Sequence, residues 1–164
     1  MMTRRNTLFS LGAVAADVAG VRGLFESSPV HAAQVYALTR TDAEWKKMLT
    51  PDQYQVLRKA GTEAPYTSPL NKEKRTGTFA CAGCAQALFA SSTKFESGTG
   101  WPSFYQPIAK KAVVEETDTT LFMKRTEVLC SNCGGHLGHV FDDGPKPTGL
   151  RYCMNGVAMN FKAA

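Results

Sequence analysis

Four of the five cysteines in this chain form two Cys-x-x-Cys pairs, and this pattern constrains the fold more than any other feature of the sequence. The pairs are Cys81 with Cys84 and Cys130 with Cys133. Zn²⁺ binds four soft ligands in a tetrahedron, and two short turns of this kind can supply all four. A site closed by four thiolates has no open coordination position, so the predicted zinc is structural. It would join distant parts of one domain, because residues 85–129 lie between the pairs.

Two other interpretations of the four cysteines remain open. One pair could be a thioredoxin-like redox pair, although no βαβ pattern surrounds either of them. The four could instead form disulfide bonds if the protein is exported to an oxidising compartment. Both pairs share the pattern Cys-x-x-Cys-x-x-x-Leu. We therefore favour two similar turns that hold one zinc ion.

The composition is that of a folded domain with an N-terminal extension. Of the 164 residues, 43% are hydrophobic, and the formal net charge is only +5, with basic residues spread among acidic ones. Proteins that bind nucleic acids concentrate positive charge on one surface, so we expect no nucleic-acid partner. Residues 36–164 are predicted to form a single zinc-binding domain.

Residues 1–35 are predicted to be an export signal with a linker. Residues 3–9, with the sequence TRRNTLF, are similar to a bacterial twin-arginine signal, and residues 30–32 offer small side chains for cleavage. An apolar stretch lies between these two segments, but Asp17 and Arg22 interrupt it, so we predict no stable membrane span. The expected location is periplasmic or otherwise exported. A cytoplasmic location is the alternative if the arginine pair has no signal function.

Two short helices are predicted to open the domain. Thr41 or Asp42 would cap the first helix, whose buried face would carry Trp45, Met48 and Leu49. The second would begin with a capping box in the sequence Thr50-Pro51-Asp52-Gln53 and end at Gly61. After Gly61, short apolar runs alternate with Gly, Pro, Ser and Asn, which is typical of antiparallel β-structure. The predicted fold is therefore mainly β.

The fifth cysteine lies in a segment, residues 150–161, that we predict to be one strand. Alternate residues of a strand share a face, so Arg151, Cys153 and Asn155 would project together. A free thiol has a pKa of about 8.5, and nearby positive charge lowers it and raises the thiolate fraction. Arg151 can supply that charge to Cys153. The alternative is a buried cysteine with a structural role.

The segment Gly134-Gly135-His136-Leu137-Gly138-His139 favours the chemical interpretation. Histidine titrates near neutrality and commonly donates protons in enzymes. A regular strand would point His136 and His139 to opposite faces. A β-bulge at Gly138 would bring both toward one site.

A glycine-flanked tryptophan, Trp101, is the last candidate. It lies in the loop sequence Gly100-Trp101-Pro102-Ser103-Phe104, where a large aromatic ring either fills the core or forms the wall of a pocket. Before any resemblance is considered, the core-filling role is favoured, because most buried tryptophans serve the core.

Taken together, these segments resemble the B-type methionine-(R)-sulfoxide reductases over about residues 42–161. The segments that carry the resemblance are Gly61-Thr62-Glu63, Pro69-Leu70-Asn71, both cysteine pairs, Gly100-Trp101-Pro102-Ser103-Phe104, His136-Leu137-Gly138-His139-Val140-Phe141 and Arg151-Tyr152-Cys153-Met154-Asn155. The resemblance implies two antiparallel sheets with a structural zinc and no organic cofactor. It implies that Cys153 is the nucleophile and that Trp101 binds the substrate methyl group. The other positions that it assigns to the active site are His136, His139, Arg151 and Asn155, with Asp143 as a supporting acid.

The implied reaction suits these residues chemically. Sulfoxide oxygen is a poor leaving group until it is protonated, so a thiolate and a protonated His136 or His139 are needed together. Cys153 would be left as a sulfenic acid, which a thioredoxin-like protein or a small thiol would reduce. The expected substrate is oxidised methionine in proteins or peptides. A zinc-stabilised binding module without catalysis is the rival hypothesis, but it leaves the arrangement around Cys153 unexplained.

One position departs from many family members, which carry a second redox cysteine in the loop before Trp101. Here that position is Thr99. Since the remaining cysteines belong to the two pairs, the usual internal disulfide is not expected.

Overall fold

The computed structural model describes residues 34–120 and 124–164. The predicted export signal therefore lies outside the described residues except for positions 34 and 35. Within the described part of the chain, no helix has the length and apolar character needed to cross a membrane.

Two short helices open the domain as predicted, and each begins with a capping box, although the sequence predicted one only for the second helix. Helix α1 spans Asp42–Met48 with Thr41 as its N-cap, and helix α2 spans Pro51–Lys59 with Thr50 as its N-cap. Trp45 of α1 and Leu49, the C-cap of this helix, are buried as expected. The predictions for two other residues were wrong. Met48 is 52% exposed, because the chain turns into α2 directly after Leu49, and Ala60 rather than Gly61 takes the left-handed conformation that ends α2.

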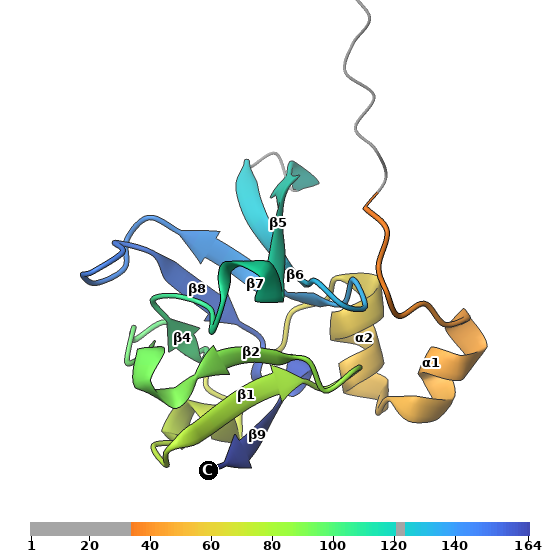
Figure 1. Ribbon diagram of the computed structural model, residues 1–164, viewed down its shortest axis with the longest axis horizontal. Helices are drawn as coiled ribbons and strands as arrows, with labels where there is room; N and C mark the ends of the chain where they lie inside the picture. Colours follow the sequence, from red (N-terminus) through yellow and green to blue (C-terminus); the bar gives the residue numbers. More distant parts are fainter. Residues whose placement is uncertain (1–33, 121–123) are drawn as a thin grey trace, which may run out of the picture. The chain divides into compact units, whose positions relative to one another are not determined.

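The rest of the domain consists of two antiparallel sheets, which confirms the predicted fold class (Figure 1). The three-stranded sheet has the order β2-β1-β9, with β1 at Gly77–Cys81, β2 at Ala87–Ala90 and β9 at Met159–Ala163. The six-stranded sheet has the order β3-β4-β8-β7-β6-β5. Its strands are β3 Lys94–Phe95, β4 Ser103–Phe104, β5 Val113–Asp118, β6 Arg125–Cys130, β7 His136–Phe141 and β8 Arg151–Met154. Short 3₁₀ turns lie at Pro69–Lys72 (η1), Ser91–Thr93 (η2), Lys110–Ala112 (η3) and Gly156–Ala158 (η5).

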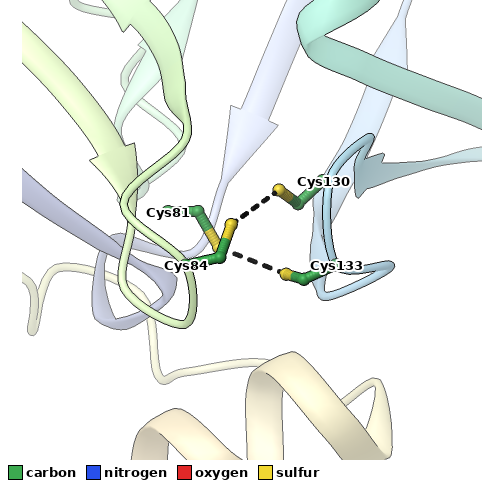
Figure 2. Close-up of side chains that lie close together, drawn as sticks. All are labelled: Cys81, Cys84, Cys130 and Cys133. Atoms are coloured by element: carbon green, nitrogen blue, oxygen red, sulfur yellow. Dashed lines mark hydrogen bonds between the residues drawn. The ribbon is translucent and has the colours of Figure 1, made fainter. Parts of the chain in front are cut away.

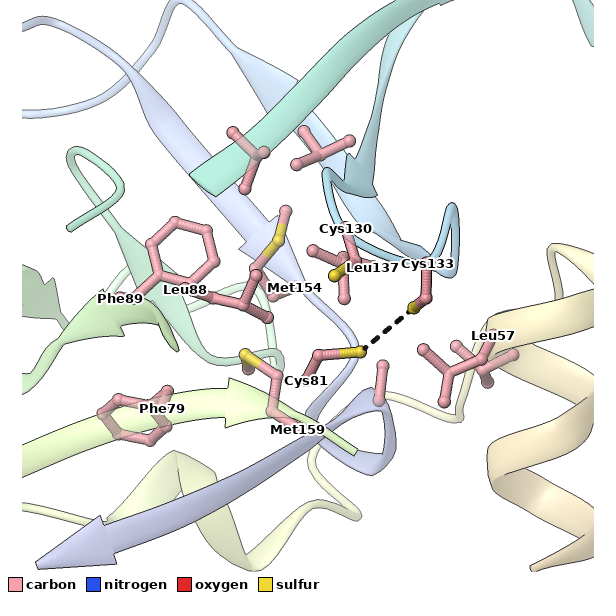
Figure 3. Close-up of a cluster of buried hydrophobic side chains, with 14 of the residues drawn as sticks. Leu57, Phe79, Cys81, Leu88, Phe89, Cys130, Cys133, Leu137, Met154 and Met159 are labelled. Atoms are coloured by element: carbon pink, nitrogen blue, oxygen red, sulfur yellow. Dashed lines mark hydrogen bonds between the residues drawn. The ribbon is translucent and has the colours of Figure 1, made fainter. Parts of the chain in front are cut away.

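An aromatic cluster joins the two sheets. Phe79 of β1 and Phe89 of β2 contact Phe104 of β4, with ring centroids 4.9 and 4.4 Å apart, and Phe89 also contacts Tyr152 of β8 at 5.7 Å. Figure 3 shows Phe79 and Phe89 in the same buried cluster as Leu137. Because Tyr152 packs into this cluster, its two neighbours in β8, Arg151 and Cys153, point to the other face of the sheet, away from the core.

The predicted strand at residues 150–161 is in fact two strands in different sheets. β8 ends at Met154, η5 follows, and β9 begins at Met159. The Glu63 carboxylate accepts hydrogen bonds from the backbone N–H groups of Gly156 (2.5 Å) and Val157 (3.0 Å), which holds the turn between them. Asn155 therefore does not continue the strand row of Cys153 but lies at the start of this turn.

The predicted bulge in β7 is present. Val128 of β6 pairs with Gly138, but the next residue, Leu129, pairs with His136, so Leu137 is the extra residue of the bulge. Leu137 turns into the core, and the rings of His136 and His139 come to lie 5.5 Å apart, edge to face. Glycine is required at position 138, because a Cβ atom there would lie 2.1 Å from the carbonyl oxygen of Cys153.

Candidate active site and metal centre

The four paired cysteines converge from two turns, one after β1 and one after β6 (Figure 2). Their sulfur atoms all lie within 4.8 Å of one another. The Sγ atoms of Cys81 and Cys133 are 3.8 Å apart, and those of Cys84 and Cys130 are 3.5 Å apart. A tetrahedral zinc–thiolate site has Zn–S bonds of about 2.3 Å, which places its sulfur atoms about 3.8 Å apart. The four thiols therefore fit a metal ion of this kind.

The helices pack against this metal centre. Arg58 of α2 donates a 3.0 Å hydrogen bond from Nη1 to the carbonyl oxygen of Cys133. Its guanidinium also lies over the ring of Trp45, 4.9 Å from the centroid. Trp45 in turn borders the first turn, because a Cβ atom built on Gly83 would lie 3.5 Å from its ring. The two helices and both turns thus form one packed unit.

The fifth cysteine lies in a row of side chains that crosses the six-stranded sheet. Cys153 of β8 lies opposite Ser103 of β4 on one side and opposite His139 of β7 on the other. His139 lies opposite Glu127 of β6. Residues directly opposite each other in antiparallel strands project from the same face. The direct pairing of β7 with β8 thus brings the thiol of Cys153 and the imidazole of His139 together on one face.

A cavity of about 140 Å³ opens at this row. It is lined by Thr62, Trp101, Arg125, Gly138, His139, Phe141, Cys153 and Asn155. Pockets for drug-sized ligands measure about 300–1,000 Å³, so this cavity suits a single side chain. A larger cavity, of about 710 Å³, is lined by residues of α2, η1, η5 and β9. We place the chemistry in the smaller cavity, because the larger one contains neither a cysteine nor a histidine.

Burial raises the pKa of the Cys153 thiol. Hydrogen bonds from Thr99 and the charge of Arg151 act in the opposite direction but do not outweigh burial. Arg151 thus lowers this pKa, as expected from the sequence, but burial, which the sequence pattern did not reveal, makes the net shift upward. The thiol is the predominant form at neutral pH.

Each histidine has a carboxylate partner that the sequence did not reveal. His139 Nε2 lies 2.8 Å from Asp118 Oδ2, and His136 Nδ1 lies 2.5 Å from Glu127 Oε1. Burial is the main reason that the pKa of His139 is lowered, although its contact with Asp118 opposes that shift. Hydrogen bonds from Thr120 and then from His139 hold the pKa of Asp118 well below its usual range. At neutral pH His139 is therefore a neutral imidazole beside an ionised carboxylate.

The two histidines are not equivalent. His139 lines the cavity, whereas His136 is only 4% exposed and its Nε2 has no hydrogen-bond partner among the described residues. The contact with Asp118 occupies Nε2 of His139, so its Nδ1 is the nitrogen left to exchange a proton. Arg125 donates to the same oxygen of Asp118 from Nη2, at 2.7 Å, and lines the cavity as well.

Trp101 and Asn155 are both held by Glu63. The indole Nε1 of Trp101 donates to the carbonyl oxygen of Glu63 at 3.1 Å, and the N–H of Glu63 donates to Asn155 Oδ1 at 3.0 Å. Asn155 Nδ2 also donates to the carbonyl oxygen of Leu137 at 3.1 Å. Trp101 lines the cavity, so of its two predicted roles the pocket wall agrees with the structure.

One sequence feature pointed to a role for Glu63, because this residue belongs to the segment Gly61-Thr62-Glu63 that carries the family resemblance. Asp118 and Glu127 had no such signal, because their role depends on strand register.

Residues 49–163 match the model of the SelR domain. A Leptospira interrogans protein named "Peptide methionine sulfoxide reductase MsrB" is 54% identical over 127 residues, covering 77% of this chain and 97% of the relative. Proteins of the same name from Methanosarcina barkeri and Pseudomonas putida are 58% identical over 126 residues and 57% identical over 125 residues. These two matches cover 77% and 76% of this chain, and 89% and 94% of the relatives.

A cysteine beside a histidine, on a two-sheet domain with a four-cysteine centre, agrees with these matches. The chain belongs to the SelR-domain family of oxidoreductases. Within it, the relatives are B-type methionine sulfoxide reductases, which confirms the resemblance seen in the sequence.

Proposed function

We propose that this protein reduces the R epimer of methionine sulfoxide, in proteins and peptides, to methionine, with Cys153 as the nucleophile. The observation that carries the proposal is the position of Cys153 opposite His139, beside a cavity lined by Trp101. The name of the relatives, which refers to peptide methionine sulfoxide, supports the choice of substrate.

In the proposed reaction, the sulfur of Cys153 attacks the sulfoxide. The overall step converts a thiol and a sulfoxide into a sulfenic acid and a thioether, so the thiol proton ends on the transferred oxygen. His139 is suited to carry that proton, because it is neutral at rest and its Nδ1 is not used by Asp118. It would take the proton from Cys153 and, once protonated, donate it to the oxygen. We assign this role to His139 rather than His136, which lies outside the cavity lining.

The remaining site residues bind and orient the substrate or set the charge near the Cys153 sulfur. Trp101 would receive the S-methyl group and so select one epimer. Asn155 has one Nδ2 hydrogen beyond its bond to Leu137, and this hydrogen is suited to the sulfoxide oxygen. Arg151 contributes positive charge near the sulfur, and Asp143 holds Arg151 in place through two hydrogen bonds.

We further propose that the metal held by the four paired cysteines is Zn²⁺. When bound, it would crosslink the two turns and contribute folding free energy rather than chemistry. Cys153 would then have no cysteine partner within the chain. Its sulfenic acid would be reduced by an external thiol, either a small molecule or a thioredoxin-like protein. Export directed by residues 1–35 stays a prediction.

A single-turnover experiment tests the proposal. The purified, reduced protein is mixed with one equivalent of a peptide that carries either the R or the S epimer of methionine sulfoxide, without added reductant. We expect one equivalent of methionine from the R epimer and none from the S epimer. The Cys153→Ser variant is the matched control and should form none from either. Equal turnover by that variant, or turnover of the S epimer alone, would contradict the proposal.

A further inference from the structure

One hydroxyl group within hydrogen-bond reach of the nucleophile belongs to Thr99, at the position where the family resemblance implies a second cysteine in many members. Its Oγ1 lies 3.8 Å from the sulfur of Cys153. It is also the first member of a chain of hydroxyl groups. Ser97 Oγ lies 2.8 Å from Thr99 Oγ1 and 2.7 Å from Ser103 Oγ, and Ser103 donates to the carbonyl oxygen of Trp101 at 3.1 Å.

The number of protons limits the direction of these hydrogen bonds, because each hydroxyl has one proton to donate. In the arrangement in which Ser103 donates its proton to the carbonyl of Trp101, Ser103 accepts from Ser97 and Ser97 accepts from Thr99. In this arrangement the Thr99 proton can point either to Ser97 Oγ or to Cys153 Sγ, because both lie within reach. While Cys153 is a thiol, its S–H can donate to Thr99 Oγ1, and every bond in the chain points away from the sulfur.

We propose that Thr99 is a catalytic residue whose hydroxyl turns from Ser97 to Cys153 when the thiolate forms, and then donates a hydrogen bond to the sulfur. The assignment rests on the proposed function, since it concerns the same nucleophile. The proton that leaves the thiol goes to His139, and the Thr99 proton stays on its oxygen. Ser97 Oγ keeps a donor after the turn, because the backbone N–H of Thr99 lies 3.4 Å from it.

The loop that carries Thr99 is fixed on both sides. Tyr66 donates from its hydroxyl to the carbonyl of Gly98 at 2.7 Å and from its backbone N–H to the carbonyl of Gly100 at 2.7 Å. Tyr66 itself has a left-handed backbone conformation, with φ of 66°. Asn71 Nδ2 adds a third bond, to the carbonyl of Gly100 at 2.9 Å. A donor held this firmly loses little conformational entropy when it binds the sulfur.

The site needs such a donor. Cys153 is half-buried, and burial disfavours the thiolate. The charged and titratable groups around the sulfur are Arg151 on its own strand, His139 on β7 and Arg125 from β6. Asp143 and Asp118 already bind both arginines. On the β4 side, the side chain opposite Cys153 is the hydroxyl of Ser103. A hydroxyl directed at the sulfur therefore supplements positive charges that are partly compensated.

The test is the pH dependence of Cys153 alkylation by iodoacetamide, followed by the mass of the zinc-loaded protein. Thr99→Val keeps the shape but removes the hydroxyl, and Thr99→Ser keeps the hydroxyl but removes the methyl group. We expect Thr99→Val to raise the midpoint of the pH–rate profile by about one unit, which is about a tenfold slower reaction at neutral pH. Thr99→Ser should keep the wild-type midpoint. Melting temperature and zinc content serve as controls for the fold.

A wild-type midpoint in Thr99→Val would overturn the assignment, as would a midpoint in Thr99→Ser as high as in Thr99→Val. Ser97→Ala gives a second measurement, which does not depend on the fold of the valine variant. It removes the competing acceptor but keeps the Thr99 hydroxyl, so the midpoint should stay at or below that of the wild type. A rise would contradict the assignment. Alkylation requires no sulfoxide, so failure of the reductase assay and failure of this test are separate results.

Discussion

Asp143 and Arg151 form a two-pronged ion pair at the edge of the candidate active site. Arg151 donates from Nε to Asp143 Oδ1 and from Nη2 to Asp143 Oδ2, at 2.8 Å each, and its guanidinium lies 4.4 Å from the ring centroid of Phe141. The hydrogen bonds from Arg151 lower the pKa of Asp143, so the carboxylate is ionised at neutral pH. Part of the positive charge near Cys153 is therefore compensated.

The first prediction concerns this compensation. Because the pKa of Cys153 is raised, its reactive thiolate increases as pH rises through and above the neutral range. Asp143→Asn leaves the guanidinium less compensated, so the midpoint of Cys153 alkylation should move to lower pH. Arg151→Gln removes the charge and should move it to higher pH. Asp142→Asn, the same change one residue earlier, is the control and should leave it unchanged. Opposite shifts would contradict this electrostatic account.

The second prediction concerns Asp118 and His139. Protonated His139 cannot accept the proton of Cys153, so activity should fall as pH drops through the His139 pKa, which lies below the ordinary 6.5. Asp118→Asn removes an interaction that raises this pKa. The acid limb of the pH profile should therefore move to still lower pH, and kcat should fall, by at most the about 10²–10⁴-fold that acid–base catalysis contributes.

Glu116→Gln is the matched control for this experiment, since Glu116 is an exposed carboxylate two residues earlier on β5. It should change neither the acid limb nor kcat. An Asp118→Asn profile that coincides with that of the control would remove His139 from the proton path.

The third prediction concerns the metal centre. We expect about one equivalent of zinc in the purified protein and none in Cys130→Ser, since three thiolates leave the site open. Structural zinc contributes an apparent 10–16 kcal/mol, roughly, to folding, so the variant should unfold or aggregate. Cys153→Ser should keep both zinc and melting temperature. Metal analysis and thermal unfolding measure these properties, and a stable Cys130→Ser protein without zinc would show that the four thiols serve another purpose.

The fourth prediction concerns Trp101. If its ring receives the S-methyl group, Trp101→Ala should weaken substrate binding by about 1–2 kcal/mol, which is roughly a five- to thirtyfold rise in KM. Trp101→Phe should be intermediate, because it keeps apolar surface but loses the hydrogen bond to Glu63. Steady-state kinetics and melting curves are compared for both variants. A large drop in melting temperature with unchanged KM would instead mean that Trp101 mainly supports the fold.

The fifth prediction concerns recycling. After one turnover without reductant, the intact mass of the wild type should increase by one oxygen, and a sulfenic-acid reagent should trap Cys153. In Thr99→Cys, the new sulfur would start from the position now occupied by Oγ1, 3.8 Å from Cys153. That variant should form an internal disulfide and lose two hydrogens instead. Loss of two hydrogens by the wild type, with release of zinc, would show that a metal-binding cysteine resolves the sulfenic acid.

Local sequence patterns predicted a large part of this structure. The N-cap at Thr41 and the capping box at Thr50 depend on residues at most three positions apart, and the bulge near Gly138 depends on adjacent ones. The cysteine turns were equally visible, because each pair is separated by two residues. In each case the interacting residues are close in the chain.

Predictions that depended on distant contacts failed or were not made. The break after Met154 is held by Glu63, more than ninety residues away in the sequence. Asp118 meets His139 only through the pairing of β5 with β6 and β6 with β7. The direction of the Cys153 pKa shift depends on burial, which the local charge pattern around Arg151 does not reveal.

Trp45 and Trp101 are placed so that their intrinsic fluorescence can report on the metal centre and on the cavity. The chain contains two tryptophans. One borders a cysteine turn of the metal centre, and the other lines the cavity beside Cys153. Intrinsic fluorescence therefore samples both centres without any added dye. Replacing either indole by phenylalanine isolates the emission of the other, so metal release and occupation of the cavity can be followed separately in the two variants.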